Sequence, residues 1–231
     1  MTVQLLSLSD SSTEEPVPLA RAEAVLCDMD GTLVDSSAVV ESMWSSFARD
    51  YGMSERFDEI MAYSPGRTGI DTIRRFLPDL AAEEQDAIHE CFAREEIVRT
   101  AGRMAEIPGA AALVTALIEV GVPLALVTSA PIELMRVRME EAGVPIPSVV
   151  VSADDVERGK PHPEGYLLGA RRLGVEPRCA AAVEDSAPGL AAARAAGVVV
   201  VAVGGAQDGD VVCRDLDELR GLLASVRGWA P

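Results

Sequence analysis

Short apolar runs alternate with helix-length stretches along most of this chain. The apolar runs span residues 22–27, 122–128, 148–152, 179–183 and 198–203. Continuous apolar runs of this length are typical of strands in a parallel sheet that is buried on both faces. The helix-length stretches each end before a glycine, which commonly terminates helices; they span 110–120, 132–142, 163–173 and 189–196. The alternation predicts an α/β fold with a doubly wound parallel sheet.

Residues 37–107 interrupt this alternation, because they contain no strand-like run. Amphipathic helices are predicted there at 38–51, 53–62, 68–76 and 81–102. We expect an all-helical cap domain at 37–107, inserted into a core domain made of 19–36 and 108–231. The alternative is that these helices belong to a layer that covers the sheet. Residues 1–18 are polar and contain two prolines, which predicts a flexible leader.

The composition narrows the classes of function. A chain of 231 residues with 48% hydrophobic residues can bury a sizeable core. Its net charge of −17 argues against binding to nucleic acid or to an anionic membrane surface, both of which require a basic footprint. An anionic substrate would also be repelled at long range, so its site needs a local cation such as a metal, a lysine or an arginine.

The four cysteines form no close pair, and Cys27 and Cys179 lie in apolar runs, where we expect them to be small core residues. No apolar segment reaches the roughly 18 residues that would span a bilayer, and no signal peptide is visible. These features predict a cytoplasmic, reduced protein, for which a monomeric state is plausible.

Two carboxylates follow the first apolar run, in the string Asp28-Met-Asp30-Gly31-Thr32. Side chains two residues apart on a strand can share a face, and Gly31 frees the backbone to turn sharply. A lone Asp-Gly pair is most often only a turn. Two buried carboxylates, however, are costly unless a cation neutralises them or one holds a proton. Oxygen ligands of this kind suit a hard cation such as Mg²⁺.

Polar residues also stand at the ends of the later apolar runs. They are Thr128-Ser129, then Lys160 in the loop after the third run, then Glu184-Asp185 after the fourth. Taken singly, the hydroxyls and acids could be helix caps and the lysine could be solvated. Ligands of open α/β sheets bind beyond the carboxyl ends of the strands, however. The placement of these polar residues therefore predicts that they lie in one site with Asp28 and Asp30.

This ordered set resembles the four motifs of the haloacid dehalogenase superfamily, over nearly the whole chain from residue 22. The resemblance implies that Asp28 attacks phosphorus and forms an aspartyl phosphate. It also implies that Asp30 protonates the leaving oxygen and then deprotonates the hydrolytic water. From charge, Lys160 should pair with Asp28 and with phosphate oxygens. The hydroxyl of Thr128 and the loop donors of Gly31, Thr32 and Ser129 should contact the phosphoryl group.

The expected metal is Mg²⁺. Its predicted ligands are Asp28, Asp185, a carbonyl near Asp30, and Glu184 through water.

Asp30 also indicates the branch of the superfamily. The resemblance implies phosphate-ester chemistry, because related dehalogenases keep no acid there: a halide leaves without a proton. The β-phosphoglucomutase-like branch carries a histidine on the first cap helix, and residues 36–44 contain none, which favours hydrolysis. Of the two histidines, we expect His89 to be solvated and His162 to lie at the rim of the site.

The cap segment with Gly66-Arg67 before a predicted helix resembles that of sugar- and polyol-phosphate phosphatases. A guanidinium and free amides at a helix N-terminus can hold an anion. Arg67 is therefore predicted to bind substrate, although a surface ion pair is the alternative. The predicted function is a Mg²⁺-dependent phosphatase of a small sugar or polyol phosphate. The alternatives are a sugar-phosphate mutase and a catalytically silent binding protein of the same fold.

Overall fold

The computed structural model describes residues 18–227. The predicted leader therefore lies outside the described residues except for Pro18, which begins the short 3₁₀-helix η1 (Pro18–Arg21). Within residues 18–227, no helix combines the length and the apolar character needed to cross a membrane.

A six-stranded parallel sheet forms the centre of the molecule, in the order β5-β4-β1-β6-β7-β8. Its strands are β1 (Ala24–Cys27), β4 (Leu124–Val127), β5 (Val149–Val151), β6 (Ala180–Glu184), β7 (Val199–Ala202) and β8 (Val211–Val212). The first five coincide with the predicted apolar runs, which confirms the doubly wound α/β fold. β8 was not predicted, because two residues are too few to show a pattern.

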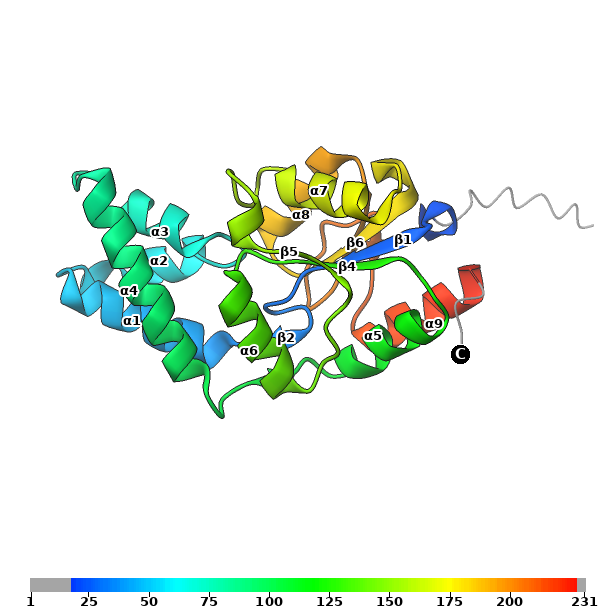
Figure 1. Ribbon diagram of the computed structural model, residues 1–231, viewed down its shortest axis with the longest axis horizontal. Coiled ribbons are helices and arrows are strands. Elements are labelled where there is room, and N and C mark those ends of the chain that lie inside the picture. Colours follow the sequence, from blue (N-terminus) through cyan, green and yellow to red (C-terminus); the bar gives the residue numbers. More distant parts are fainter. Residues whose placement is uncertain (1–17, 228–231) are drawn as a thin grey trace, which may run out of the picture.

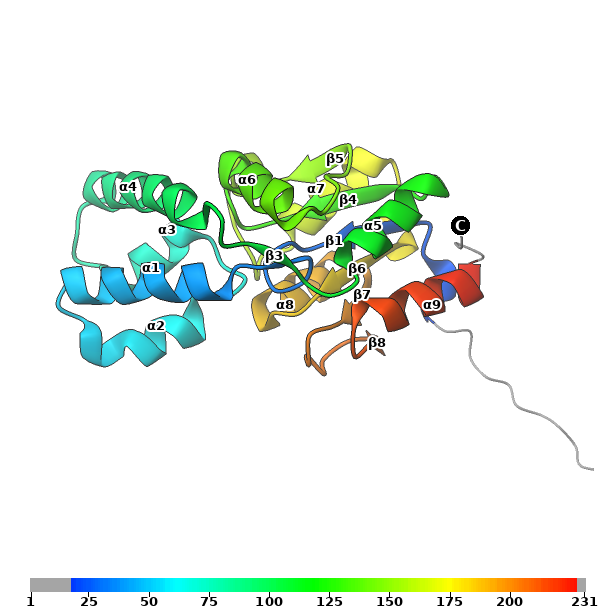
Figure 2. The same ribbon diagram turned by 90° about the horizontal axis from the view of Figure 1, so that it is seen from below.

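Helices cover both faces of the sheet (Figures 1 and 2). They are α5 (Ala110–Glu119), α6 (Ile132–Ala142), α7 (Glu164–Leu173), α8 (Ala187–Ala196) and α9 (Leu216–Arg227). Alternate residues of β1 explain the two layers. Val25 and Cys27 pack with α5, α6 and α9, whereas Ala24 and Leu26 pack with α7 and α8. Cys27 lies in the core as expected, but Cys179 is only half-buried, because it precedes β6 in a 3₁₀ turn.

The helices within residues 37–107 lie together to one side of the sheet (Figure 1). They are α1 (Ser37–Asp50), η2 (Ser54–Arg56), α2 (Phe57–Tyr63), α3 (Gly69–Phe76) and α4 (Ala82–Thr100). Their apolar faces form a separate core, which includes Met43, Trp44, Phe47 and Phe92. A helical cap is thus present, rather than another sheet-covering layer.

The insert is not purely helical, however. β3 (Ala105–Glu106), which lies within 37–107, pairs antiparallel with β2 (Val34–Asp35), which precedes α1. Both connections between the cap helices and the core therefore run through one short ribbon. Two-residue strands gave no alternation in the sequence, so the ribbon was not predicted.

Candidate active site

The switch point of the sheet lies at the carboxyl end of β1. From β1 the sheet extends to β4 and β5 on one side and to β6, β7 and β8 on the other. Asp28 follows β1 directly, and its backbone N–H donates to Val183 of β6 at 3.0 Å. In open α/β sheets, a crevice for ligands forms at such a point.

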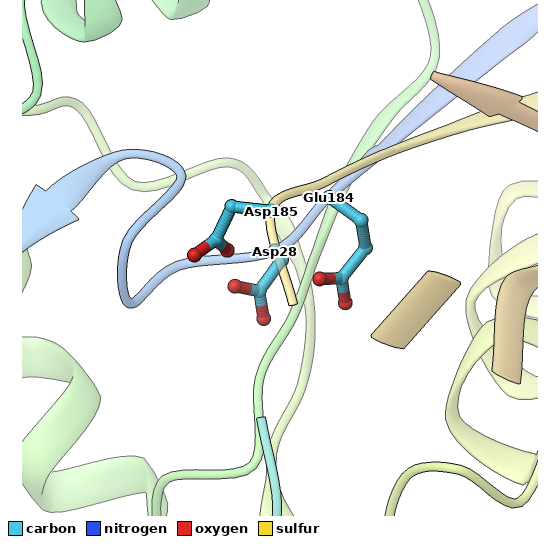
Figure 3. Close-up of side chains that lie close together, drawn as sticks. All are labelled: Asp28, Glu184 and Asp185. Carbon is cyan, nitrogen blue, oxygen red and sulfur yellow. The ribbon is translucent and has the colours of Figure 1, made fainter. Parts of the chain in front are cut away.

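Three carboxylates meet there. Oxygens of Asp28, Glu184 and Asp185 all lie within 4.8 Å of one another, and Figure 3 shows that they come from the ends of β1 and β6. Asp28 and Glu184 are buried and Asp185 is half-buried. Such a set of oxygen donors fits a hard divalent cation. The structure thus brings together three of the four predicted metal ligands.

Lys160 lies between two of these carboxylates. Its Nζ donates to Asp28 Oδ1 and to Glu184 Oε1, each at 2.5 Å, and to the carbonyl of Val127 at 3.1 Å. Only 5% of the lysine side chain is exposed. Lys160 therefore fixes the orientation of Asp28. The structure thus places Lys160 beside the carboxylates, where the sequence predicted it to lie.

Glu184 is held from several sides. Tyr166 donates its hydroxyl to Oε1 at 2.6 Å, and Ser186 donates its hydroxyl to Oε2 at 3.1 Å. A Cβ on Gly189 would lie 1.9 Å from Oε1, so the carboxylate fills the space that the glycine leaves. With both oxygens already accepting hydrogen bonds, Glu184 is the least available of the three for direct contact with a metal.

Negative charge accumulates in this cluster. Burial and the neighbouring Glu184 raise the pKa of Asp28, while Lys160 opposes the rise. Burial and Glu184 also raise the pKa of Asp185, to about 6, against the hydrogen bond from Thr32. Burial lowers the pKa of Lys160, but Asp28 and Glu184 outweigh it and raise the pKa overall. One lysine among three acids leaves an excess of negative charge, which a cation would balance.

Gly31 and Thr32 make the turn that follows β1. Gly31 has φ +85°, and a Cβ there would lie 2.2 Å from Asp185 Oδ2. Its N–H donates to Val34, and that of Thr32 donates to Met29. Thr32 is fully buried and donates its hydroxyl to Asp185 at 2.9 Å. These donors are engaged inside the protein, so Gly31 and Thr32 shape the carboxylate cluster. Gly31 also lines the cavity between the core and the cap, and the contact of both residues with substrate stays a prediction.

The two hydroxyl residues after β4 are placed differently from each other. Thr128 is buried, and its Oγ1 accepts from the N–H of Ala130 at 3.1 Å, which leaves its own hydrogen free to donate. Ser129 donates its hydroxyl to the carbonyl of Gly66, in the cap, at 2.9 Å. Neither caps α6, which begins after Pro131 without a side-chain cap. Ser129 is therefore a contact between core and cap.

Asp30 points to a different partner. Its Oδ1 accepts from Arg138 Nη1 at 2.9 Å, and Arg138 Nη2 donates to Glu96 of α4 at 2.5 Å. One oxygen of the Asp30 side chain is thus held by α6, and the metal ligand predicted near Asp30 stays a prediction. Sequence reasoning missed Arg138 and Glu96. The available signal was an arginine on the same face of α6 as the buried Leu134 and Met135.

A cavity of about 320 Å³ opens between the core site and the cap. Asp28, Asp30 and Asp185 line its core side, and Arg67, Trp44 and His89 are among the residues of its cap side. Arg67 donates to the carbonyl of Tyr63 at 2.9 Å, and its guanidinium lies 4.2 Å from the centre of the Tyr63 ring. The predicted ion-pair alternative for Arg67 is not seen among the described residues.

The position of one of the two histidines, His89, differs from the prediction. His89 is half-buried on the cavity wall, and burial lowers its pKa, so the prediction that it is solvated was wrong. His162 lines a smaller hollow beside Lys160, with 31% of its side chain exposed.

Comparisons with known proteins agree with this geometry. A family model described as haloacid dehalogenase-like hydrolase matches residues 22–197. Hexitol phosphatase A of Escherichia coli is 39% identical over 188 residues, which cover 81% of this chain and 86% of the relative. Glycerol-1-phosphate phosphohydrolase 2 of Saccharomyces cerevisiae is 32% identical over 199 residues, which cover 83% of this chain and 78% of the relative.

Among solved structures, β-phosphoglucomutase from Clostridium difficile superimposes with a TM-score of 0.78. The superposition covers 90% of this chain and 98% of the mutase chain. At 18% identity, this likeness bears on the fold alone. The match to the family model extends over most of the chain and includes the ends of β1, β4 and β6. The chain therefore belongs to the haloacid dehalogenase-like hydrolase family.

Proposed function

We propose that the protein is a Mg²⁺-dependent phosphatase that hydrolyses a small sugar or polyol phosphate. The observation that carries the proposal is the carboxylate of Asp28, held by Lys160 beside Asp185 at the floor of a cavity that the cap covers. A cavity of about 320 Å³ suits a small metabolite. The relatives named above as a hexitol phosphatase and a glycerol-1-phosphate phosphohydrolase support the substrate class.

The residues for a metal ion are Asp28, Asp185 and the backbone carbonyl of Asp30. Glu184 takes part through water, because Lys160, Tyr166 and Ser186 already use its oxygens. When bound, Mg²⁺ would offset the repulsion between the Asp28 carboxylate and the anionic phosphoryl group.

The reaction proceeds in two steps. In the first, Asp28 bonds to phosphorus as the ester bond to phosphorus breaks, and Asp30 gives its proton to the leaving oxygen. The products are an aspartyl phosphate and an alcohol. In the second, Asp30 takes a proton from a water molecule whose oxygen attacks phosphorus. The acyl-phosphate bond then breaks, which restores Asp28 and releases phosphate.

Other residues hold the phosphoryl group and the alcohol. The free hydroxyl hydrogen of Thr128 donates to the phosphoryl oxygens, and the positive charge of Lys160, whose Nζ already donates to three acceptors, attracts them. Arg67, presented by the loop before α3, contacts the part of the substrate that lies under the cap. We further propose that the cap domain spans 37–107 and that the protein acts in the cytoplasm. All four cysteines are free thiols, as is usual in a reducing compartment.

Phosphate release tests this proposal. Purified protein should release phosphate from glycerol phosphate and from a hexitol 6-phosphate when Mg²⁺ is present, and not after chelation. Asp28→Asn should reduce release to background, whereas Asp79→Asn, at an exposed position in the cap, should not. Wild-type activity in Asp28→Asn would refute the mechanism. Isomerisation of a sugar 1-phosphate faster than phosphate release would instead indicate the mutase.

A further inference from the structure

We propose that Arg138 is a positioning residue for Asp30, and that it ties the orientation of this acid to cap helix α4 through Glu96. The inference rests on the proposed function, in which Asp30 transfers the protons. It adds a residue from α6 that none of the four motifs contains.

The guanidinium of Arg138 lies between one carboxylate of the core and one of the cap. Nη1 donates to Asp30 Oδ1 at 2.9 Å, and Nη2 donates to Glu96 Oε1 at 2.5 Å. The three residues come from the turn after β1, from α4 and from α6. Because the guanidinium is planar and rigid, fixing one of its nitrogens on Glu96 also fixes the other nitrogen on Asp30.

Stability alone does not explain this arrangement, because burying the charged guanidinium of Arg138 costs free energy. Only 3% of the Arg138 side chain is exposed, and within residues 18–227 its Nε has no hydrogen-bond partner. Replacing a buried ion pair by apolar side chains of similar volume is often neutral or stabilising. The packing of α6 against the core by Leu134, Met135 and Met139 does not require an arginine.

The second oxygen of Asp30 is left available. In the described part of the chain, Oδ2 accepts no hydrogen bond, and Asp30 lines the cavity with 29% of its side chain exposed. Arg138 thus holds one oxygen of the acid and leaves the other without a hydrogen-bond partner among the described residues, on a side chain that lines the cavity. A general acid needs such reach to the atom that it protonates.

The test compares two leaving groups. Glycerol phosphate releases a poor leaving group that requires a proton, whereas p-nitrophenyl phosphate releases a stabilised phenolate that does not. The value of kcat/KM reports the step in which the ester bond breaks. Asp30→Asn should lower kcat/KM for glycerol phosphate by about 100-fold or more relative to p-nitrophenyl phosphate. Arg138→Met should shift the same ratio by about tenfold, and Arg138→Lys, which keeps the charge, should shift it less.

Two further variants separate positioning from a general structural role. Adding Arg138→Met to Asp30→Asn should cause no further shift in the ratio, because both act on the same proton transfer. Arg99→Met is the control, since Arg99 is a half-buried arginine of α4 that bonds to Ser42 and Ser46 within the cap and not to Asp30. Its ratio should match that of the wild type.

The outcomes are distinct. An equal loss for both substrates in Arg138→Met and no shift in Arg138→Lys would overturn the role of Arg138 while leaving the proposed function in place. The role of Arg138 would also be overturned if the double variant shifted the kcat/KM ratio by the product of the shifts of the two single variants. If Asp30→Asn left the kcat/KM ratio of the two substrates unchanged, the proton-transfer role of Asp30 would be overturned, and with it the role of Arg138.

Discussion

Two buried cations in this protein each lie between two carboxylates, but their surroundings differ. Lys160 bridges Asp28 and Glu184, and all three residues belong to the core. Arg138 bridges Asp30 and Glu96, and this second group spans the core and the cap. The first group has a third acid beside it, Asp185, and so carries excess negative charge. In our proposals, the first group builds the site for phosphate and metal, while the second sets the geometry between core and cap.

The largest difference between the groups should appear in stability. With chelator present, Lys160→Met should lower the free energy of unfolding by about 3–5 kcal/mol, because it strands two buried carboxylates. Arg138→Met should cost about 1–3 kcal/mol, because its partners are more exposed. Urea denaturation at neutral pH measures both values. A smaller loss for Lys160→Met than for Arg138→Met would contradict the comparison.

Metal binding should distinguish the groups through its pH dependence. The pKa of Asp185 is raised from 3.8 to about 6, so the folded protein holds this proton more tightly than the unfolded chain does. Without metal, this group therefore adds stability as the pH falls from about 6 to 4, and that contribution is lost as the pH rises through 6.

Mg²⁺ requires the ionised carboxylate, so its affinity should fall below pH 6. The increase in melting temperature on adding Mg²⁺ should consequently be larger at pH 7.5 than at pH 5.5. Asp185→Asn should abolish the increase, and Glu96→Gln should not. An equal increase at both pH values would rule out a metal site that depends on Asp185.

The turn after β1 offers a sharper probe of the first group. Gly31→Ala would place a Cβ 2.2 Å from Asp185, so we expect metal affinity and kcat/KM to fall about tenfold. Gly121→Ala is the matched control, because Gly121 also has positive φ, at +74°, but has no atom within 4 Å of a Cβ. The control should lose only the stability that this backbone strain costs, about 1–2 kcal/mol. Equal activity losses in the two variants would show that backbone strain, not the contact with Asp185, is responsible.

The smallest expected effect lies on the cap side of the cavity. Arg67→Ala should raise KM several-fold and change kcat little, because the contact is remote from phosphorus. Arg75 also lies near the Tyr63 ring, at 5.9 Å, but does not line the cavity, so Arg75→Ala is the control. Steady-state kinetics with a hexitol phosphate measures both. An unchanged KM in Arg67→Ala would remove Arg67 from the substrate site.

The same comparison shows what the sequence could and could not predict. Asp28, Lys160, Glu184 and Asp185 were predictable because each follows an apolar run, and the ends of parallel strands converge at one edge of a sheet. The contact between Arg138 and Glu96 depends on how the cap packs on the core, which no local pattern encodes. For the same reason, the bond of Ser129 to Gly66 and the position of His89 could not be read from residue spacing.

The fold was predictable to a similar degree. Long periodic elements gave clear patterns, whereas the two-residue strands β2, β3 and β8 gave none. Helix α9 was also missed, although Leu216, Leu219 and Leu223 recur at helical spacing and are buried. In that case the signal was present in the sequence.

The central claim is that Asp28 carries the phosphoryl group. Acid quench during turnover of a hexitol phosphate with Mg²⁺, followed by borohydride reduction, converts an aspartyl phosphate to homoserine. Peptide mass spectrometry should then find homoserine at position 28, dependent on both substrate and Mg²⁺. Steady phosphate release with no modification at position 28, or with modification at another acidic residue, would contradict the account.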